Sequence, residues 1–107
     1  MLAAAITGEI VMAKGYWFAR MTINNPDEYP KYVETAKPAF EKFGARFLAR
    51  GGRYDAVEGD GRPRNVIIEF DSFEKAIACY NSPEYQAAAV IRQRCAEGEI
   101  VVIEGVD

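Results

Sequence analysis

The sequence of 107 residues contains no histidine and only two cysteines. Without an imidazole, the chain cannot supply a histidine ligand to haem, a two-histidine iron site or a Ser-His-Asp triad. Cys79 and Cys95 are too far apart for a CxxC metal or redox motif, so we expect both to be reduced, in a cytoplasmic protein. Catalysis would have to use carboxylates, phenols, thiols, the cations of Lys and Arg, or a borrowed cofactor.

Motifs for bound groups and an excess of positive charge are also missing. Neither Gly51-Gly52 nor Gly59-Asp60-Gly61 has the spacing of a nucleotide-binding loop, and no acidic run has EF-hand spacing. We therefore expect no cofactor and no metal. The 13 basic and 16 acidic side chains give a net charge of -3, which argues against nucleic acid as a partner. Small molecules and other protein chains are the partners that we expect.

The first residues lack the features of a membrane segment. The apolar run over residues 2–6 is short, no basic residue precedes Lys14, and Glu9 interrupts the stretch, so we expect neither a signal peptide nor a membrane anchor. Met12 resembles an ordinary start that a strand follows at once. We interpret residues 1–11 as an N-terminal extension and residues 12–107 as a single domain. The alternative is an ordered N-terminal arm.

Apolar and aromatic residues, interrupted by turn residues, predict four strands. The strands are expected at residues 15–23, 45–50, 65–71 and 99–104. We expect the second strand to bend at Gly51-Gly52 and to resume at residues 54–58, before a turn at residues 59–63.

Helical spacing of apolar residues predicts a helical region after the first strand and another after the third. The first begins with Asn25 as N-cap and Pro26 in the first turn, is kinked or split near Pro30 and Pro38, and ends at Gly44. The second begins after Ser72, breaks at residues 81–84 and ends at Gly98. The resulting order βαββαβ is typical of the ferredoxin-like α+β fold, a four-stranded antiparallel sheet with helices on one face.

Alternation along the strands sorts their residues into two faces. An entirely apolar set, which we expect under the helices, comprises Trp17, Ala19, Met21, Ile23, Phe47, Ala49, Val66, Ile68, Phe70, Val101 and Ile103. A mixed set, which we expect on the open face, comprises Tyr16, Phe18, Arg20, Arg46, Leu48, Arg50, Ile67, Glu69, Ile100, Val102 and Glu104.

The mixed set is too apolar for a sheet face that meets water. A chain of this length also has a modest core. We therefore predict that a second copy of the chain covers the open face and forms a homodimer.

The candidate binding site is a cavity on this open face. In the strand order 4-1-3-2, Arg20 and Arg50 both flank the start of the third strand, and two guanidiniums there suit a small organic acid or aromatic anion. Tyr16 and Phe18 would form its walls. The alternative is that the arginines form structural ion pairs with Glu69 and Glu104, because buried charges are usually paired.

Glu69 and Tyr80 are the candidates for catalysis. An apolar neighbourhood would raise the pKa of Glu69 and make it a general base, although a salt bridge to Arg46 explains it equally well. Tyr80 would place a phenol in a pocket, with a role in the core as the alternative. Arg53, Arg62 and Arg64 form either an anion-attracting rim or a solvated loop.

Five segments together resemble a family of small bacterial proteins known as domain-of-unknown-function family thirteen-thirty. The segments are Met12-Ala13-Lys14-Gly15-Tyr16-Trp17, Gly44-Ala45-Arg46-Phe47-Leu48-Ala49-Arg50-Gly51-Gly52, Arg62-Pro63-Arg64, Ile68-Glu69-Phe70 and Tyr80-Asn81-Ser82-Pro83-Glu84-Tyr85-Gln86. The resemblance covers the chain from Met12 to Val106 and implies the dimeric α+β barrel superfamily.

The family brings no established activity. The wider superfamily includes cofactor-independent monooxygenases, muconolactone isomerases and haem enzymes such as chlorite dismutase, so the fold does not choose a reaction. The missing histidine excludes a histidine-ligated haem. The sequence thus predicts a homodimer with a pocket for an anionic or aromatic metabolite, acting as a metal-free isomerase or cofactor-independent monooxygenase. The alternative is a non-enzymatic dimeric ligand-sensing or interaction module.

Overall fold

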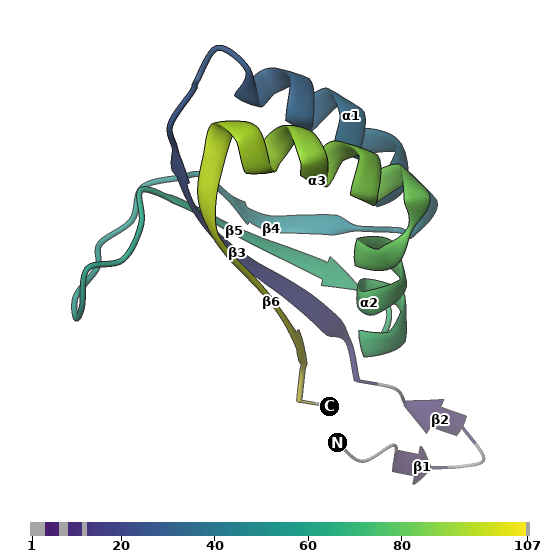
Figure 1. The fold of residues 1–107 in the computed structure, drawn as a ribbon. Coiled ribbons are helices and arrows are strands. Elements are labelled where there is room, and N and C mark those ends of the chain that lie inside the picture. Colours follow the sequence, from purple (N-terminus) through teal and green to yellow (C-terminus); the bar gives the residue numbers. More distant parts are fainter. Residues whose placement is uncertain (1–3, 7–8, 12, 107) are drawn as a thin grey trace.

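One four-stranded antiparallel sheet and three helices make up the body of the protein. The computed structural model describes residues 4–6, 9–11 and 13–106. The elements of the body are β3 (Gly15–Ile23), α1 (Tyr29–Lys42), β4 (Arg46–Arg50), β5 (Arg64–Phe70), α2 (Phe73–Asn81), α3 (Pro83–Cys95) and β6 (Ala96–Glu104). The strand order is β4-β5-β3-β6, and the three helices lie on one face of the sheet (Figure 1). The predicted ferredoxin-like α+β fold and its strand order are confirmed.

Two short strands precede the body. β1 (Ala4–Ile6) pairs antiparallel with β2 (Glu9–Val11), with Ala4 opposite Val11. Residues 1–3, 7, 8 and 12 lie outside the described residues. The division into an extension over 1–11 and a domain from residue 12 therefore stays a prediction.

Side-chain caps and one glycine fix the helix ends that the sequence predicts. The hydroxyl of Ser72 accepts a hydrogen bond from the Lys75 N–H, and that of Ser82 accepts one from the Tyr85 N–H, so each satisfies a free donor of a first turn. At the end of α1, the Gly44 N–H donates to the Glu41 carbonyl and Gly44 has φ +69°. This is the left-handed turn that glycine adopts most readily.

The start and the continuity of α1 differ from the prediction. Asn25 organises a turn, since its side chain accepts from the Asp27 N–H at 3.2 Å, but the helix itself begins at Tyr29. Pro38 does not split the helix, which is continuous from Tyr29 to Lys42. Because Ala36 and Ala39 on the same helix are fully buried against the core, packing offsets the backbone hydrogen bond that Pro38 cannot donate.

Two further boundaries were predicted wrongly. Residues 54–58 are not a strand; residues 51–63 form a long loop that extends away from the body (Figure 1). Gly98 does not end the second helical region, because α3 ends at Cys95 and β6 begins at once with Ala96. Gly98 lies within β6, opposite Met21 of β3.

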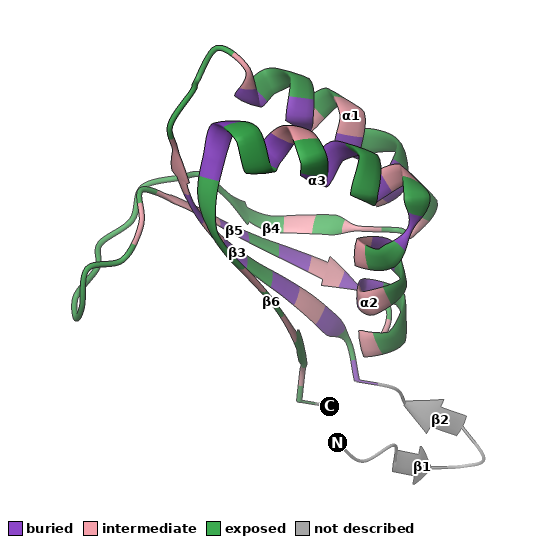
Figure 2. Ribbon diagram, viewed as in Figure 1, coloured by how far each residue is buried: buried purple, intermediate pink, exposed green. Residues whose placement is uncertain are grey.

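The core lies between the sheet and the helices and is centred on Trp17. Its indole is 1% exposed, donates a hydrogen bond to the Ala76 carbonyl at 2.8 Å, and lies 4.9 Å from the ring of Tyr85, centroid to centroid. Buried positions alternate along β3 and β5, and the helices bury the faces that meet them (Figure 2). The expected apolar helix side of these two strands is confirmed.

We expect Gly98→Ala to destabilise the fold. A Cβ at this position would lie 1.9 Å from the Arg20 carbonyl oxygen, so β6 would have to move away from β3. Overpacking of this kind costs about 1–3 kcal/mol, measured as the free energy of unfolding in urea. Gly52→Ala is the matched control, because a Cβ there would have no neighbour within 4 Å. Equal losses in the two variants would contradict the close approach.

Candidate functional site

The face of the sheet opposite the helices carries a patch of exposed apolar side chains. Its large members are Phe18, Leu48, Ile67, Val101 and Ile103. Register places Phe18 opposite both Ile67 and Val101, so these three side chains share one face across three strands. A patch of this kind is unusual on the surface of a monomer.

The two alternate sets of β6 residues face the opposite sides of the sheet from those predicted. Ile100 and Val102 pack against the core, whereas Val101 and Ile103 are 52% and 56% exposed. Both alternate sets of this strand are apolar, so hydrophobicity alone could not orient it. Glu104 is paired with Gly15, which shifts it away from the open-face set in which we expected it.

A β-bulge in β4 places Arg50 on the helix side. The pairing with β5 changes between Phe47, opposite Ile68, and Ala49, opposite Ile67, so one additional residue enters β4. Arg50 is consequently opposite Val66, whose side chain is buried under the helices. Arg20, opposite Asn65, stays on the open face. The two arginines that we expected to converge therefore lie on opposite faces of the sheet.

At one end of the open face, Glu69 is held by two neighbours. Arg46 Nε donates to Glu69 Oε1 at 2.8 Å, and the Tyr16 hydroxyl donates to Oε2 at 3.2 Å. The hydrogen bond from Arg46 is the main reason that the pKa of Glu69 is lowered. The expected rise in the pKa of Glu69 is wrong, and the alternative, a salt bridge to Arg46, is what forms.

At the other end of this face, Glu99 accepts from two arginines. Arg20 Nη2 lies 3.1 Å from Oε1, and Arg62 Nη2 lies 3.1 Å from Oε2. Arg62 also donates to the Thr22 hydroxyl at 2.8 Å. Arg20 is thus already paired with a carboxylate. Phe18 and Arg20 of β3 line one pocket together with Tyr54 of the loop.

The helix side contains a small aromatic cavity that adjoins a groove. The cavity has a volume of about 40 Å³, and the groove between α1 and β4 has a volume of about 530 Å³. The two share the side chains of Val33, Phe40, Phe47 and Arg50. The deeper walls of the cavity include Trp17, Met21, Tyr29, Tyr32, Val66 and Ile68. A ligand would need both spaces, because the cavity alone is too small for an organic molecule.

Two guanidiniums line this cavity, and neither forms an ion pair with any of the described residues. Arg50 lies over the ring of Phe47 at 4.0 Å, and Arg64 lies over the ring of Tyr29 at 5.3 Å. Arg64 Nε is buried without a hydrogen-bond partner in the described part of the chain. A Cβ on Gly51 would meet Arg64 Nη1 at 2.4 Å, so this glycine makes room for the guanidinium.

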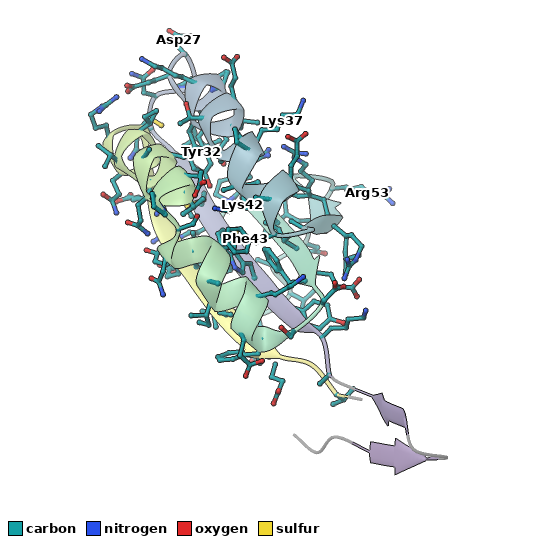
Figure 3. All side chains as sticks on the ribbon, turned by 90° about the vertical axis from the view of Figure 1, so that its right-hand side faces the viewer. Asp27, Tyr32, Lys37, Lys42, Phe43 and Arg53 are labelled. Carbon is teal, nitrogen blue, oxygen red and sulfur yellow. The ribbon has the colours of Figure 1, made fainter. Side chains whose placement is uncertain are left out.

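A pair of buried phenols, those of Tyr32 and Tyr85, lies at the inner side of the cavity, and Tyr32 is one of its lining residues. The hydroxyls of Tyr32 and Tyr85 are 2.8 Å apart, and Figure 3 shows Tyr32 reaching from α1 toward α3. Burial is the main cause that raises the pKa of Tyr85, against the nearby positive charge of Arg92, which lowers it. Burial also raises the pKa of Tyr32 well above its usual 10.0. Both phenols are therefore protonated at neutral pH and can donate hydrogen bonds.

The candidates from the sequence thus fall into three places. Tyr16, Phe18, Arg20 and Glu69 lie on the open face, Arg50 lies at the helix-side cavity, and Tyr80 packs against the rings of Trp17 and Tyr85. Sequence reasoning missed Arg64 as a cavity residue. The signal was present, because Arg64 starts the strand whose alternate residues, Val66 and Ile68, form the core.

The sheet order and the helices on one face define a ferredoxin-like α+β protein. Residues 14–106 match the family described as domain of unknown function DUF1330, and the chain belongs to that family. No curated protein matches the sequence. No helix in the described residues is long and apolar enough to cross a membrane.

Solved structures of similar fold include uncharacterised proteins and one oxygenase. A Rhodopseudomonas palustris protein of unknown function, RPA0582, is 17% identical with a TM-score of 0.68, and the match covers 89% of this chain and 84% of that one. SnoaB, a cofactor-independent oxygenase from Streptomyces nogalater, is 10% identical with a TM-score of 0.63, over 89% and 95% of the two chains. A dimeric ferredoxin-like protein from Thermobifida fusca is 14% identical with a TM-score of 0.59, over 90% and 92%.

The lowered pKa of Glu69 predicts a specific dependence of stability on pH. A carboxylate whose pKa is lowered by folding stabilises the fold above its unfolded pKa, and this contribution is lost as the pH falls through the folded value. We expect Glu69→Gln to be less stable than the wild type at neutral pH, and the gap to close as the pH falls below 4.5. Unfolding in urea at a series of pH values measures the difference in the free energy of unfolding between the two proteins. Glu58→Gln, in the exposed loop, is the control, and a gap that widens in acid would refute the pairing.

Proposed function

We propose that the chain binds a small aromatic carboxylate in the cavity and groove between α1 and the sheet. The observation that carries the proposal is the pair of guanidiniums, Arg50 and Arg64, that line an aromatic cavity and form no ion pair with the described residues. Glu34 and Glu41 line the adjoining groove, within ion-pairing distance of neither arginine. The aromatic part of the ligand would lie against Tyr29 and Phe47, and its carboxylate would be placed between the two arginines.

Physical chemistry favours this class of ligand over neutral or cationic ones. Arg presents paired donors in a plane that matches a carboxylate, and a hydrogen bond between charged groups is shorter and stronger than a neutral one. The apolar walls favour a ring over a polar chain. Arg50, which the sequence selected as a binding residue, keeps that role in the proposal, with Arg64 in place of Arg20 as its partner.

We further propose that the open sheet face is the interface of a homodimer. Five large apolar side chains form a continuous patch there, and ion pairs of Arg46 with Glu69 and of Arg20 with Glu99 lie at its two ends. Charged pairs that flank an apolar centre fix the register in which two copies meet. In this arrangement Tyr16, Phe18, Arg20 and Glu69 belong to the interface.

Turnover of the bound ligand, by metal-free isomerisation or cofactor-independent oxygenation, is a second candidate function. It is supported by the similarity in fold to SnoaB and by the protonated phenols of Tyr32 and Tyr85 behind the cavity. A phenol can donate a hydrogen bond to an oxygen that gains negative charge as a substrate is deprotonated. The alternative is a ligand-sensing module that binds without turnover, and it requires the same pocket.

Benzoate binding tests the pocket. We expect calorimetry to detect benzoate binding to the wild-type protein and to show a loss of about tenfold or more in affinity for Arg64→Gln and for Arg50→Gln. Arg53→Gln is the matched control. Arg53 is an exposed arginine in the loop between β4 and β5, and its side chain points away from the body (Figure 3). Unchanged affinity in both Arg50→Gln and Arg64→Gln would eliminate the proposed anion site.

Light scattering at micromolar concentration tests the interface. We expect twice the mass of the chain for the wild type and the mass of one chain for Val101→Asp, because a carboxylate would be buried in the apolar patch. Val90→Asp on α3 is the control, since Val90 and Val101 are 55% and 52% exposed in the single chain. A wild-type protein with the mass of one chain would refute the dimer. Equal masses for Val101→Asp and Val90→Asp would also refute it.

A further inference from the structure

A second cavity lies at the edge of the sheet, between the end of α3 and the first half of β6. Its volume is about 350 Å³, and its lining residues are Tyr80, Arg92, Gln93, Ala96, Glu97, Gly98 and Ile100. It shares only Ile100 with the aromatic cavity described above. The residues that carry the proposed function therefore leave this space unexplained.

The charge at this cavity comes from a buried arginine. Arg92 is only 7% exposed, and its Nε atom is buried with no hydrogen-bond partner in residues 13–106. No carboxylate of those residues lies within ion-pairing distance of it. The groups that face it are the phenols of Tyr32, Tyr80 and Tyr85, of which Tyr85 interacts with the guanidinium directly. A cation buried in this way is costly unless an anion compensates it.

The strand beside Arg92 brings one acidic residue, Glu97, to the cavity lining, but Glu97 forms no ion pair with Arg92. Ala96 is opposite Ile23 and Gly98 is opposite Met21, so both are on the helix side of β6. Glu97, between them, is opposite Thr22, so alternation directs its side chain toward the other face of the sheet, although the residue still forms part of the cavity lining. On the helix side β6 contributes the small side chain of Ala96 and the glycine Gly98 to the cavity, which leaves room beside the guanidinium of Arg92.

We propose that this cavity binds the oxyanion group, carboxylate or phosphate, of a small metabolite, with Arg92 as its counter-charge. Gln93 and Tyr80 line the same space and add an amide and a phenol that can donate hydrogen bonds. The volume falls within the range of small-molecule sites and exceeds what an isolated inorganic ion fills, so an organic part fits beside the anionic group. The site is distinct from the Arg50–Arg64 pocket and can exist without it.

Titration with inorganic phosphate and with acetate, followed by amide NMR, tests this site. We expect saturable shifts at the Gly98 backbone amide and the Gln93 side-chain amide, at constant ionic strength set by chloride. Binding of both anions indicates a general oxyanion site, and binding of phosphate alone or acetate alone indicates the class of the natural ligand. The absence of saturable shifts at Gly98 and Gln93 with both anions would overturn the proposal.

Variants of α3 make the assignment specific to Arg92. We expect Arg92→Gln to weaken binding by about tenfold or more, since the charge-assisted hydrogen bonds are lost. Arg94→Gln is the matched control, because Arg94 lies on the same helix and forms an ion pair with Glu28 at 2.7 Å. If Arg92→Gln does not fold, Gln93→Glu tests the site instead. A carboxylate at the cavity would compete with the anion for Arg92 and weaken its binding. Wild-type affinity in Gln93→Glu, or in a folded Arg92→Gln, would refute the site.

Discussion

The packing of Trp17 holds the two layers of the protein together. Its indole N–H donates to the carbonyl of Ala76 in α2, and its ring meets Phe40 of α1 and Tyr85 of α3 edge to face. One side chain of the central strand thus contacts all three helices, so the helices cannot shift over the sheet independently. Trp17 and Phe40 line the aromatic cavity, so its shape depends on this cluster.

Charges are distributed unequally over the two sides of the sheet. On the open face Arg20, Arg46 and Arg62 each pair with a carboxylate. On the helix side Arg50, Arg64 and Arg92 form no ion pair with the described residues, although Arg64 and Arg92 each have a buried Nε atom. Since the chain has a net charge of -3, the lack of ion pairs at these three arginines is set by position and not by composition. It is the physical reason for assigning both proposed anion sites to the helix side.

Much of the fold could be predicted from the sequence because the signals were local. Ser72, Ser82 and Gly44 end or begin helices through contacts within a few residues, and the alternating residues of β3 show which of its faces is buried. The candidate site was harder to predict, because it depends on the β-bulge. One extra residue near Leu48 reverses the side of Arg50, and neither the composition nor the spacing of β4 indicates that residue.

Pairing between strands determines two further features that the sequence alone does not define, the orientation of β6 and the place of Arg64. In β6, both alternate sets are apolar, so only its register with β3 shows that Val101 points to the open face and Val102 to the core. The sequence places Arg64 either in an anion-attracting rim or in a solvated loop, whereas its place opposite Met21 makes it part of the cavity. These are long-range relations, and short sequence windows do not contain them.

The two outer strands of the sheet differ in how readily they could pair with a strand from another molecule. β4 has five residues and a bulge, which leaves little regular backbone for a new ladder. β6 has nine residues, but Glu97 and Glu99 lie in its first half, so antiparallel pairing of two copies there would bring like charges together. Both edges therefore resist growth of the sheet into a continuous multi-chain ribbon.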